Sequence, residues 1–219
     1  MTDNQWEKGK SMALRFYANK LRYKEKQFNR LFPLDDYFKP MIGDKREVSI
    51  ADLGAGMFST TGSSWPTAIV RMYPSDILAD EYNQLLKDKG VTPLIPVEKQ
   101  DMMNLTYSNE FFDIVHCVNA LDHCQNPISA LKEMYRVCKY GGWIYLRHFL
   151  NNGEYHHYHG FHKWNISKSN GDSFIWGEKV TDCCYFAEYF SGFLTYTQDI
   201  PINPGVIIVS TMRKGNNND

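Results

Sequence analysis

Apolar positions along this 219-residue chain recur with two periods, one typical of strands and one of helices. Apolar positions three and four apart predict a helix that is capped by Ser75 and ends near Gly90. A second helix is predicted to begin at Asn126 and Pro127 and to end at Gly141 and Gly142. Short apolar runs predict strands at residues 48–53, 68–73, 93–97, 111–118 and 143–150.

The two ends of the chain have a different pattern. Residues 5–30 mix apolar and basic positions and predict an amphipathic helix, and Pro33 ends that pattern. Residues 193–199 and 206–212 predict two strands that are too close in sequence for a crossover helix, so they must pair antiparallel. Strands that alternate with helices form parallel βαβ units. We therefore predict an α/β fold: a Rossmann-like open, mostly parallel sheet with helices on both faces and a C-terminal antiparallel hairpin.

We expect one domain with additions. Residues 1–45 are predicted to be an N-terminal helical lid or extension, and residues 46–219 the core, with a histidine- and aromatic-rich substrate loop at about 148–180. The basic N-terminal helix has four open roles: a lid over a cofactor, a homodimer surface, a contact for an anionic substrate, or a solvated basic face.

Composition and charge narrow the class of protein. The formal net charge of −1 gives no electrostatic case for binding nucleic acid. No apolar run approaches the roughly 18 residues of a membrane span, and no secretory signal is visible. The cysteine count is five, which is odd, and no pair has zinc-type spacing. These features favour reduced thiols in a cytoplasmic protein.

A glycine-rich turn follows the first predicted strand in the string V-S-I-A-D-L-G-A-G, residues 48–56. Gly54 and Gly56 permit positive φ and leave room for a ligand. Three acids, Asp52, Asp76 and Asp101, follow three successive strands and are expected to point into one crevice. Ser59 stands where a dinucleotide fingerprint has its third glycine, which disfavours a nicotinamide oxidoreductase and favours S-adenosylmethionine, a cofactor without phosphate.

Four segments carry a family resemblance over about residues 46–212: D-L-G-A-G, S-D-I-L-A-D-E-Y-N-Q-L-L, F-F-D-I-V-H-C-V-N-A-L-D-H-C-Q-N-P and Y-G-G-W-I-Y-L. They resemble class I S-adenosylmethionine-dependent methyltransferases, in particular a methyltransferase-11-like branch often linked to surface glycan synthesis. The resemblance implies S-adenosyl-L-methionine as cofactor. It also implies a cofactor site made by Asp52, Gly54, Ala55, Gly56, Asp76, Ile77, Asp101, Met102, Asn119, Ala120 and Leu121.

Candidate catalytic residues follow the fourth and fifth strands. His123 is a natural base for a hydroxyl nucleophile, because the imidazole pKa lies near ~6.5. Its neighbour Asp122 is open to the role of base, metal ligand or substrate hydrogen-bond acceptor, and the pair is also compatible with a simple loop cap. His148 is the third candidate. The loop histidines lack the spacing of a zinc motif and no Cys or Glu motif completes a zinc set, so we predict no metal. If a metal is bound, Asp122, His123 and His148 are the expected ligands.

Histidines and aromatic residues alternate in the segment after His148. Aromatic rings beside polar groups suit sugars, so we predict substrate contacts from Tyr155, His157, His162 and Trp164. An aromatic lid packed on itself is the alternative. The sequence therefore predicts an enzyme that methylates a small-molecule or glycan acceptor, with O-methylation of a sugar hydroxyl as the first choice. Methylation of a phosphate-type oxygen or of an amine on a glycan substituent, or a non-catalytic cofactor-binding subunit, are the alternatives. The N-A-L-D motif, which lacks the prolines of nucleic-acid methyltransferases, disfavours a nucleic-acid acceptor.

Overall fold

The computed structural model describes residues 3–24, 31–179, 183–186, 194–201 and 205–215. The helices are α1 (Asp3–Lys24), η2 (Asp36–Phe38), α2 (Lys39–Ile42), α3 (Ala79–Asp88), η3 (Leu121–His123), α4 (Pro127–Val137) and α5 (Asn152–Tyr155). The strands are β1 (Glu47–Leu53), β2 (Ile69–Asp76), β3 (Glu98–Lys99), β4 (Phe112–Val118), β5 (Cys138–Phe149), β6 (Trp164–Ser169), β7 (Asp172–Gly177), β8 (Cys184–Tyr185), β9 (Leu194–Pro201) and β10 (Val206–Arg213).

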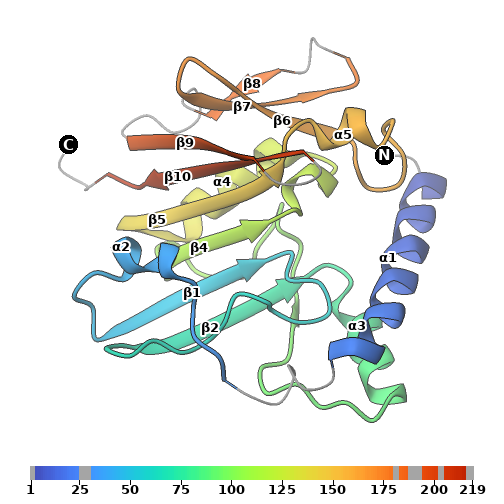
Figure 1. Cartoon of the computed structure of the whole chain (residues 1–219), viewed down its shortest axis with the longest axis horizontal. Coiled ribbons are helices and arrows are strands. Elements are labelled where there is room, and N and C mark those ends of the chain that lie inside the picture. The colour runs from blue at the N-terminus through green and yellow to red at the C-terminus, as the bar shows by residue number, and fades with distance from the viewer. Residues whose placement is uncertain (1–2, 25–30, 180–182, 187–193, 202–204, 216–219) are drawn as a thin grey trace.

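The main sheet has seven strands in the order β3-β2-β1-β4-β5-β10-β9. The strands β1 to β5 pair parallel with one another, while β10 runs antiparallel to both β5 and β9. This arrangement confirms the predicted Rossmann-like sheet and its C-terminal antiparallel hairpin (Figure 1).

Each face of the main sheet has its own hydrophobic core because successive side chains of a strand point to opposite faces. Val48 and Ile50 of β1 pack with Phe38 of η2 and with the buried residues of α2. Ala51 and Leu53 pack on the other face with the buried side of α4. Helices therefore cover both faces, as predicted.

Two predicted boundaries agree with the structure. Helix α4 begins at Pro127, and Asn126 caps it by accepting a hydrogen bond from the Ser129 amide. The end of α3 is followed by Gly90, which has a φ of +67°. At these two positions, the side-chain cap and the left-handed glycine mark the helix boundary as predicted.

Three predicted boundaries are wrong. Ser75 does not cap α3, because it lies inside β2 and is buried there. The third strand is not at 93–97 but at Glu98–Lys99, since Pro93 and Pro96 cannot donate ladder hydrogen bonds. Helix α4 ends at Val137, and the two glycines expected to stop it lie within β5 beside a shift of its pairing with β4.

The segment expected to be a substrate loop at about 148–180 forms instead the helical turn α5 and most of a second, three-stranded sheet, β6-β7-β8. Asn170 and Gly171 connect β6 to β7 with positive φ at both residues, which is the chemistry of a tight hairpin turn. Ile166 and Ile175 of this sheet pack into the same core as α4. The prediction overlooked this Asn-Gly signal between two alternating apolar runs.

Helix α1 lies across the carboxyl ends of the parallel strands, next to α3 (Figure 1). Lys10 on α1 forms a 2.5 Å ion pair with Glu81 on α3. Residues 25–30, which belong to the predicted N-terminal helix, lie outside the described residues. Of the helices in the described ranges, none is both long enough and apolar enough to cross a lipid bilayer.

Candidate functional site

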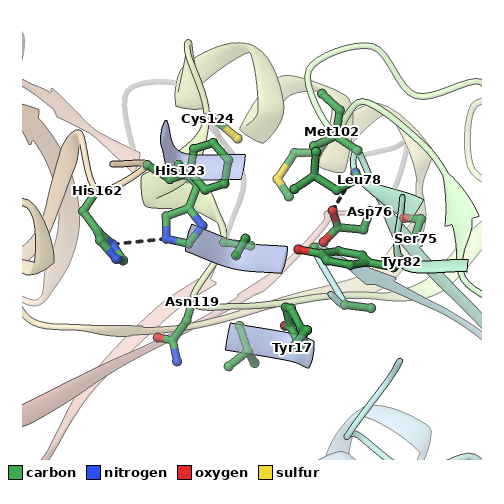
Figure 2. A pocket seen from close by; sticks show the side chains of 18 of the residues that line it. Tyr17, Ser75, Asp76, Leu78, Tyr82, Met102, Asn119, His123, Cys124 and His162 are labelled. Carbon is green, nitrogen blue, oxygen red and sulfur yellow. Dashed lines mark hydrogen bonds between the residues drawn. The ribbon is translucent and has the colours of Figure 1, made fainter. Parts of the chain in front are cut away.

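A cavity of about 950 Å³ lies at the carboxyl ends of the parallel strands, beneath α1. Its walls come from α1, the glycine turn after β1, the ends of β2 and β4, the 100–103 turn and the 149–162 segment. Figure 2 shows Asp76, Tyr82 and Met102 on one side of this space and His123 and His162 on the other. In open α/β sheets, the carboxyl edge is where ligands bind.

The glycine turn forms a cradle with no room for side chains. Gly54 and Gly56 have φ values of +71° and +69°. A Cβ on Gly54 would lie 2.2 Å from the Cβ of Ala120, and one on Gly56 would lie 1.8 Å from the hydroxyl of Tyr17. Both conformation and space therefore require glycine at these positions.

Asp76 ties the glycine turn to the start of α3. One carboxylate oxygen accepts a 2.9 Å hydrogen bond from the Gly56 amide, and the other accepts a 2.9 Å bond from the Leu78 amide. Burial raises the pKa of Asp76, while these two bonds oppose the rise. The carboxylate also lines the cavity, so its position is fixed before any ligand arrives.

Asp52 lines the floor of the cavity and has protein partners of its own. Its Oδ1 is 2.8 Å from Nδ1 of His116, and its Oδ2 accepts a 3.3 Å bond from the Thr61 hydroxyl. The other ring nitrogen of His116 is 3.0 Å from the Tyr37 hydroxyl. This buried chain holds the acid at the end of β1 in one orientation.

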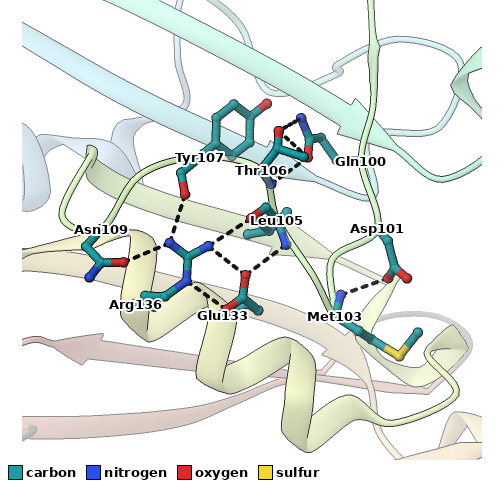
Figure 3. Close-up of polar contacts among 9 residues, drawn as sticks. All are labelled: Gln100, Asp101, Met103, Leu105, Thr106, Tyr107, Asn109, Glu133 and Arg136. Atoms are coloured by element: carbon teal, nitrogen blue, oxygen red, sulfur yellow. Dashed lines mark hydrogen bonds and ion pairs between the residues drawn. The ribbon is translucent and has the colours of Figure 1, made fainter.

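The segment that follows Asp101, Met102 and Met103 is anchored from α4 (Figure 3). Asp101 accepts a 2.9 Å bond from the Met103 amide, which closes the turn. Arg136 donates to the carbonyls of Leu105 and Tyr107 at 2.9 and 2.8 Å. A planar guanidinium reaches several carbonyls at once, so α4 fixes the segment that leads out of this wall.

The opposite wall of the cavity contains a cluster of one carboxylate and two imidazoles. Nδ1 of His162 lies 2.9 Å from Oδ2 of Asp122 and 3.1 Å from Nε2 of His123. The amide of Asn152 donates to the same Asp122 oxygen at 2.9 Å. Asp122 is 1% exposed and lies behind the histidines.

The start of β6 brings His162 to this cluster. The amide of Lys163 donates to the Asp122 carbonyl at 3.2 Å, and the indole of Trp164 donates to the Cys124 carbonyl at 2.8 Å. Trp164 thus fastens the second sheet to the turn after β4. His162 follows from that attachment, although it lies about forty positions from Asp122 in sequence.

Burial and the shared carboxylate shift the pKa values of the cluster. Burial lowers the pKa of His123, although the Asp122 carboxylate opposes it. Burial alone would raise the pKa of Asp122, but the neighbouring histidines hold it below its usual range. Burial lowers the pKa of His148 to about 4. Asp122 is therefore ionised, and His123 and His148 favour the neutral imidazole at neutral pH.

The structure brings many of the predicted residues to the cavity wall: Asp52, Gly54, Ala55, Asp76, Ile77, Asp101, Met102, Asn119, Ala120, His123 and His162. Others do not line it. Gly56 lies beneath Tyr17, Leu121 is in the core, and Asp122 and His148 are buried behind the wall. Tyr155 is 72% exposed, His157 is exposed, and Trp164 packs against the core.

Several lining residues were not predicted: Trp6, Tyr17, Tyr82, Asn152, His156 and Phe161. Their roles depend on contacts between distant segments, such as the 5.0 Å approach of the Trp6 and Phe161 rings and the 3.9 Å stacking of His156 on His162. Asn119 carries a local sign of a special position, since it has a φ of +50°. Non-glycine residues in this region often mark functional sites.

Residues 52–146 match the model of a methyltransferase domain, and this segment includes the glycine turn, Asp76 and the turn after β4. This match supports a class I S-adenosylmethionine-dependent methyltransferase. A curated relative is the ubiquinone/menaquinone biosynthesis C-methyltransferase UbiE of Coxiella burnetii, 28% identical over 110 residues. That match covers 50% of this chain and 36% of the relative, so the chain spans little more than a third of its length.

Solved structures show the same fold at low sequence identity. A putative S-adenosyl-L-methionine-dependent methyltransferase from Methanococcus maripaludis has a TM-score of 0.56 and 12% identity, over 94% of this chain and 93% of the other. The [4+2]-cyclase SpnF also has a TM-score of 0.56 and 12% identity, over 95% of each chain. A cyclase with this fold shows that the fold by itself does not fix the reaction.

The cavity fits S-adenosylmethionine, the cofactor of this family. Gly54 and Ala55 of the glycine turn line the cavity, and Asp76 and Met102 line it beside them. The amide oxygen of Asn119 is buried and, among the described residues, has no hydrogen-bond partner. Since buried polar atoms are nearly always paired, this acceptor suits a ligand that donates a hydrogen bond.

Proposed function

We propose that this chain transfers a methyl group from S-adenosylmethionine to an oxygen nucleophile of a small-molecule acceptor. One observation carries the proposal: the glycine cradle with Asp76 and the Asp122–His123–His162 cluster face each other across a single cavity. A cofactor half and a proton-handling half in one space are what oxygen methylation requires.

Bound in the cradle, S-adenosylmethionine would supply an already activated methyl group. Asp76, Met102 and Asn119 are the residues proposed to hold it. The remaining task of the protein is to position the acceptor and manage its proton, since a neutral alcohol is a poor nucleophile. We assign that task to the cluster, in which His123 reaches the cavity and Asp122 and His162 fix its ring.

The walls near the cluster favour an acceptor with both apolar and polar faces. Trp6, Phe161 and Phe149 offer ring surfaces, and Asn152 and Gln125 offer hydrogen-bonding groups. Such a mixture suits a sugar, whose C–H face stacks on aromatic rings while its hydroxyls bond to polar groups. A sugar hydroxyl is therefore our first choice of acceptor.

A planar phenolic ring is the second choice, because the matched relative UbiE is named as a ubiquinone/menaquinone biosynthesis C-methyltransferase. The same aromatic walls accept a flat ring, and removing a phenolic proton also activates a ring carbon. The two choices differ in their product, which carries the new methyl group on oxygen or on carbon.

The test combines binding and turnover. Calorimetry should show that S-adenosylmethionine binds to the wild-type chain, and that it binds with similar affinity to His123→Ala. Incubation with methyl-¹³C-labelled S-adenosylmethionine and panels of sugars and phenols should give a labelled product, whose carbon shift in NMR identifies an O-methyl or C-methyl group. His123→Ala should lower the rate about 100-fold or more, within the usual range for a positioned base.

His159→Ala is the matched control, because His159 is an exposed histidine of the same loop that does not line the cavity. Its rate should equal that of the wild type. Tight cofactor binding without transfer to any acceptor would favour a non-catalytic subunit. Full activity of His123→Ala would remove the cluster from the proposed reaction.

A further inference from the structure

The three donor atoms of the Asp122–His123–His162 cluster lie at the distances from one another that ligands of a single metal ion have. Oδ2 of Asp122 and Nδ1 of His162 are 2.9 Å apart, the two histidine nitrogens 3.1 Å, and Nε2 of His123 and Oδ2 of Asp122 3.5 Å. With metal–ligand bonds of about 2.0–2.2 Å, ligands lie about 2.8–3.1 Å apart at a right angle and about 3.3–3.6 Å apart at the tetrahedral angle. The triangle therefore has the dimensions of one face of a metal coordination shell.

Protons alone do not satisfy this cluster. Nδ1 of His162 has three polar neighbours: the Asp122 carboxylate, Nε2 of His123 and the Asn152 amide nitrogen at 2.9 Å. A ring nitrogen carries either one hydrogen or one lone pair. If Nδ1 of His162 carries a hydrogen, it cannot accept a hydrogen bond from the Asn152 amide. If Nδ1 carries a lone pair, it cannot donate to the Asp122 carboxylate. With a cation among the three donor atoms, the lone pairs of Asp122, His123 and His162 all point at one positive charge, and the Asn152 amide donates to the Asp122 carboxylate.

A second observation points the same way. Oδ1 of Asp122 and both ring nitrogens of His148 are buried and have no hydrogen-bond partner among the described residues. A buried carboxylate with an unpaired oxygen is costly, and a bound cation offsets that cost. Asn152 already donates to the Asp122 carboxylate, as outer-shell groups do to metal-bound carboxylates.

We propose that Asp122, His123 and His162 bind one divalent transition-metal ion, such as Zn²⁺, Mn²⁺ or Fe²⁺, at the cluster end of the cavity. Two imidazoles and one carboxylate suit these ions, whereas Mg²⁺ and Ca²⁺ prefer shells of oxygen. Three protein ligands leave coordination positions open, and His123 and His162 line the cavity. The sequence prediction of no metal rested on motif spacing and composition, and its alternative ligand set had His148 where the structure brings His162.

The consequence for the reaction rests on the proposed function. An acceptor hydroxyl bound at an open position would be oriented in the cavity, and the ion would lower its pKa, as zinc lowers that of bound water to about 7. Its proton would pass to solvent water. With the His123 lone pair bound to the ion, the ion and not His123 would make the acceptor oxygen nucleophilic.

The direct test uses metal alone and the full-length chain. After treatment with a chelator and dialysis, the wild type is titrated with Co²⁺, whose visible absorption reports its ligands, and with Zn²⁺ by calorimetry. We expect one ion per chain. His162→Ala should weaken binding about 100-fold or more, and His159→Ala, an exposed histidine of the same loop, should bind as the wild type does. Circular dichroism and S-adenosylmethionine binding establish that each variant is folded.

The outcomes separate this proposal from the proposed function. Equal metal binding by the wild type and a folded His162→Ala, or no binding by the wild type, overturns the metal site. Methyl transfer by a chelator-treated chain at the full rate also overturns it and leaves the proposed function intact. One bound ion that is lost in His162→Ala supports the site even where no acceptor is methylated, a result that counts against the proposed function alone.

Discussion

The substitution Asp76→Ala tests how the cofactor cradle is held together. Asp76 accepts two backbone hydrogen bonds of 2.9 Å, one from Gly56 in the glycine turn and one from Leu78 at the start of α3. Hydrogen bonds to a charged group contribute about 1.5–3 kcal/mol each. Because burial raises the pKa of Asp76 and so opposes its charged form, we take the lower value for both bonds.

The two bonds together predict a loss of about 3 kcal/mol in the free energy of unfolding. For a chain of this size, each kcal/mol moves the melting temperature by about 2–4 °C, so the midpoint should fall by about 6–12 °C. Because the glycine turn loses its anchor, affinity for S-adenosylmethionine should fall by about 1–3 kcal/mol, or roughly 5- to 150-fold.

Differential scanning calorimetry measures the first effect and titration calorimetry the second. Asp80→Ala is the matched control, since Asp80 lies on the exposed side of α3 and forms an ion pair with the exposed Lys99. It should leave cofactor affinity unchanged. A folded Asp76→Ala variant with an unaltered midpoint and an unaltered dissociation constant would refute the reasoning.

Three further substitutions test other parts of the fold. Asn126→Ala removes the cap of α4 and should cost about 1 kcal/mol in urea denaturation, and Asn126→Asp should restore it. Arg136→Lys loses the fork that holds the 105–107 turn, so stability should fall by about 1–3 kcal/mol and cofactor affinity should fall with it. Burial alone would raise the pKa of Asp113, but the hydrogen bonds from Lys139 and Ser49 outweigh burial and hold this pKa below its usual value. A carboxyl whose pKa is lower in the folded than in the unfolded state stabilises the fold at pH values above its unfolded pKa, about 3.9. This contribution is lost as the pH falls through the folded pKa. Asp113→Asn should therefore be less stable than the wild type at pH 7, and an equal difference in urea midpoint at pH 7 and pH 3 would contradict this assignment.

The sequence by itself determined the order along the chain of the strands in the main sheet, the helices α3 and α4, and the carboxyl edge of the sheet as the site. These features follow from local signals, each of which depends on residues only a few positions apart in sequence. Examples are the hydrophobic period, the Asn126 cap and left-handed glycines such as Gly54. A glycine turn after the first strand and acids after later strands must meet at one edge once the strands are parallel. The family resemblance added the cofactor.

Where local signals competed, the tertiary structure decided. Ser75 has the chemistry of a helix cap, yet pairing with β1 extends β2 through it, because a sheet hydrogen bond and burial outweigh a cap at that position. The segment after His148 has the composition of a loop, but the apolar side chains of Ile166 and Ile175 find a core shared with α4. Burial of such side chains depends on partners far away in sequence.

The composition of the cluster facing the cofactor cradle is the clearest case of tertiary control. The sequence placed Asp122 and His123 together, but His162 joins them only because the Lys163 amide and the Trp164 indole attach the second sheet to the turn after β4. Helix α1 likewise places Tyr17 on Gly56 across a distance that no periodicity encodes. Local pattern fixes which elements form and which edge they share; the distances between donor atoms, on which the proposed proton and metal chemistry depends, arise only when distant segments pack against one another.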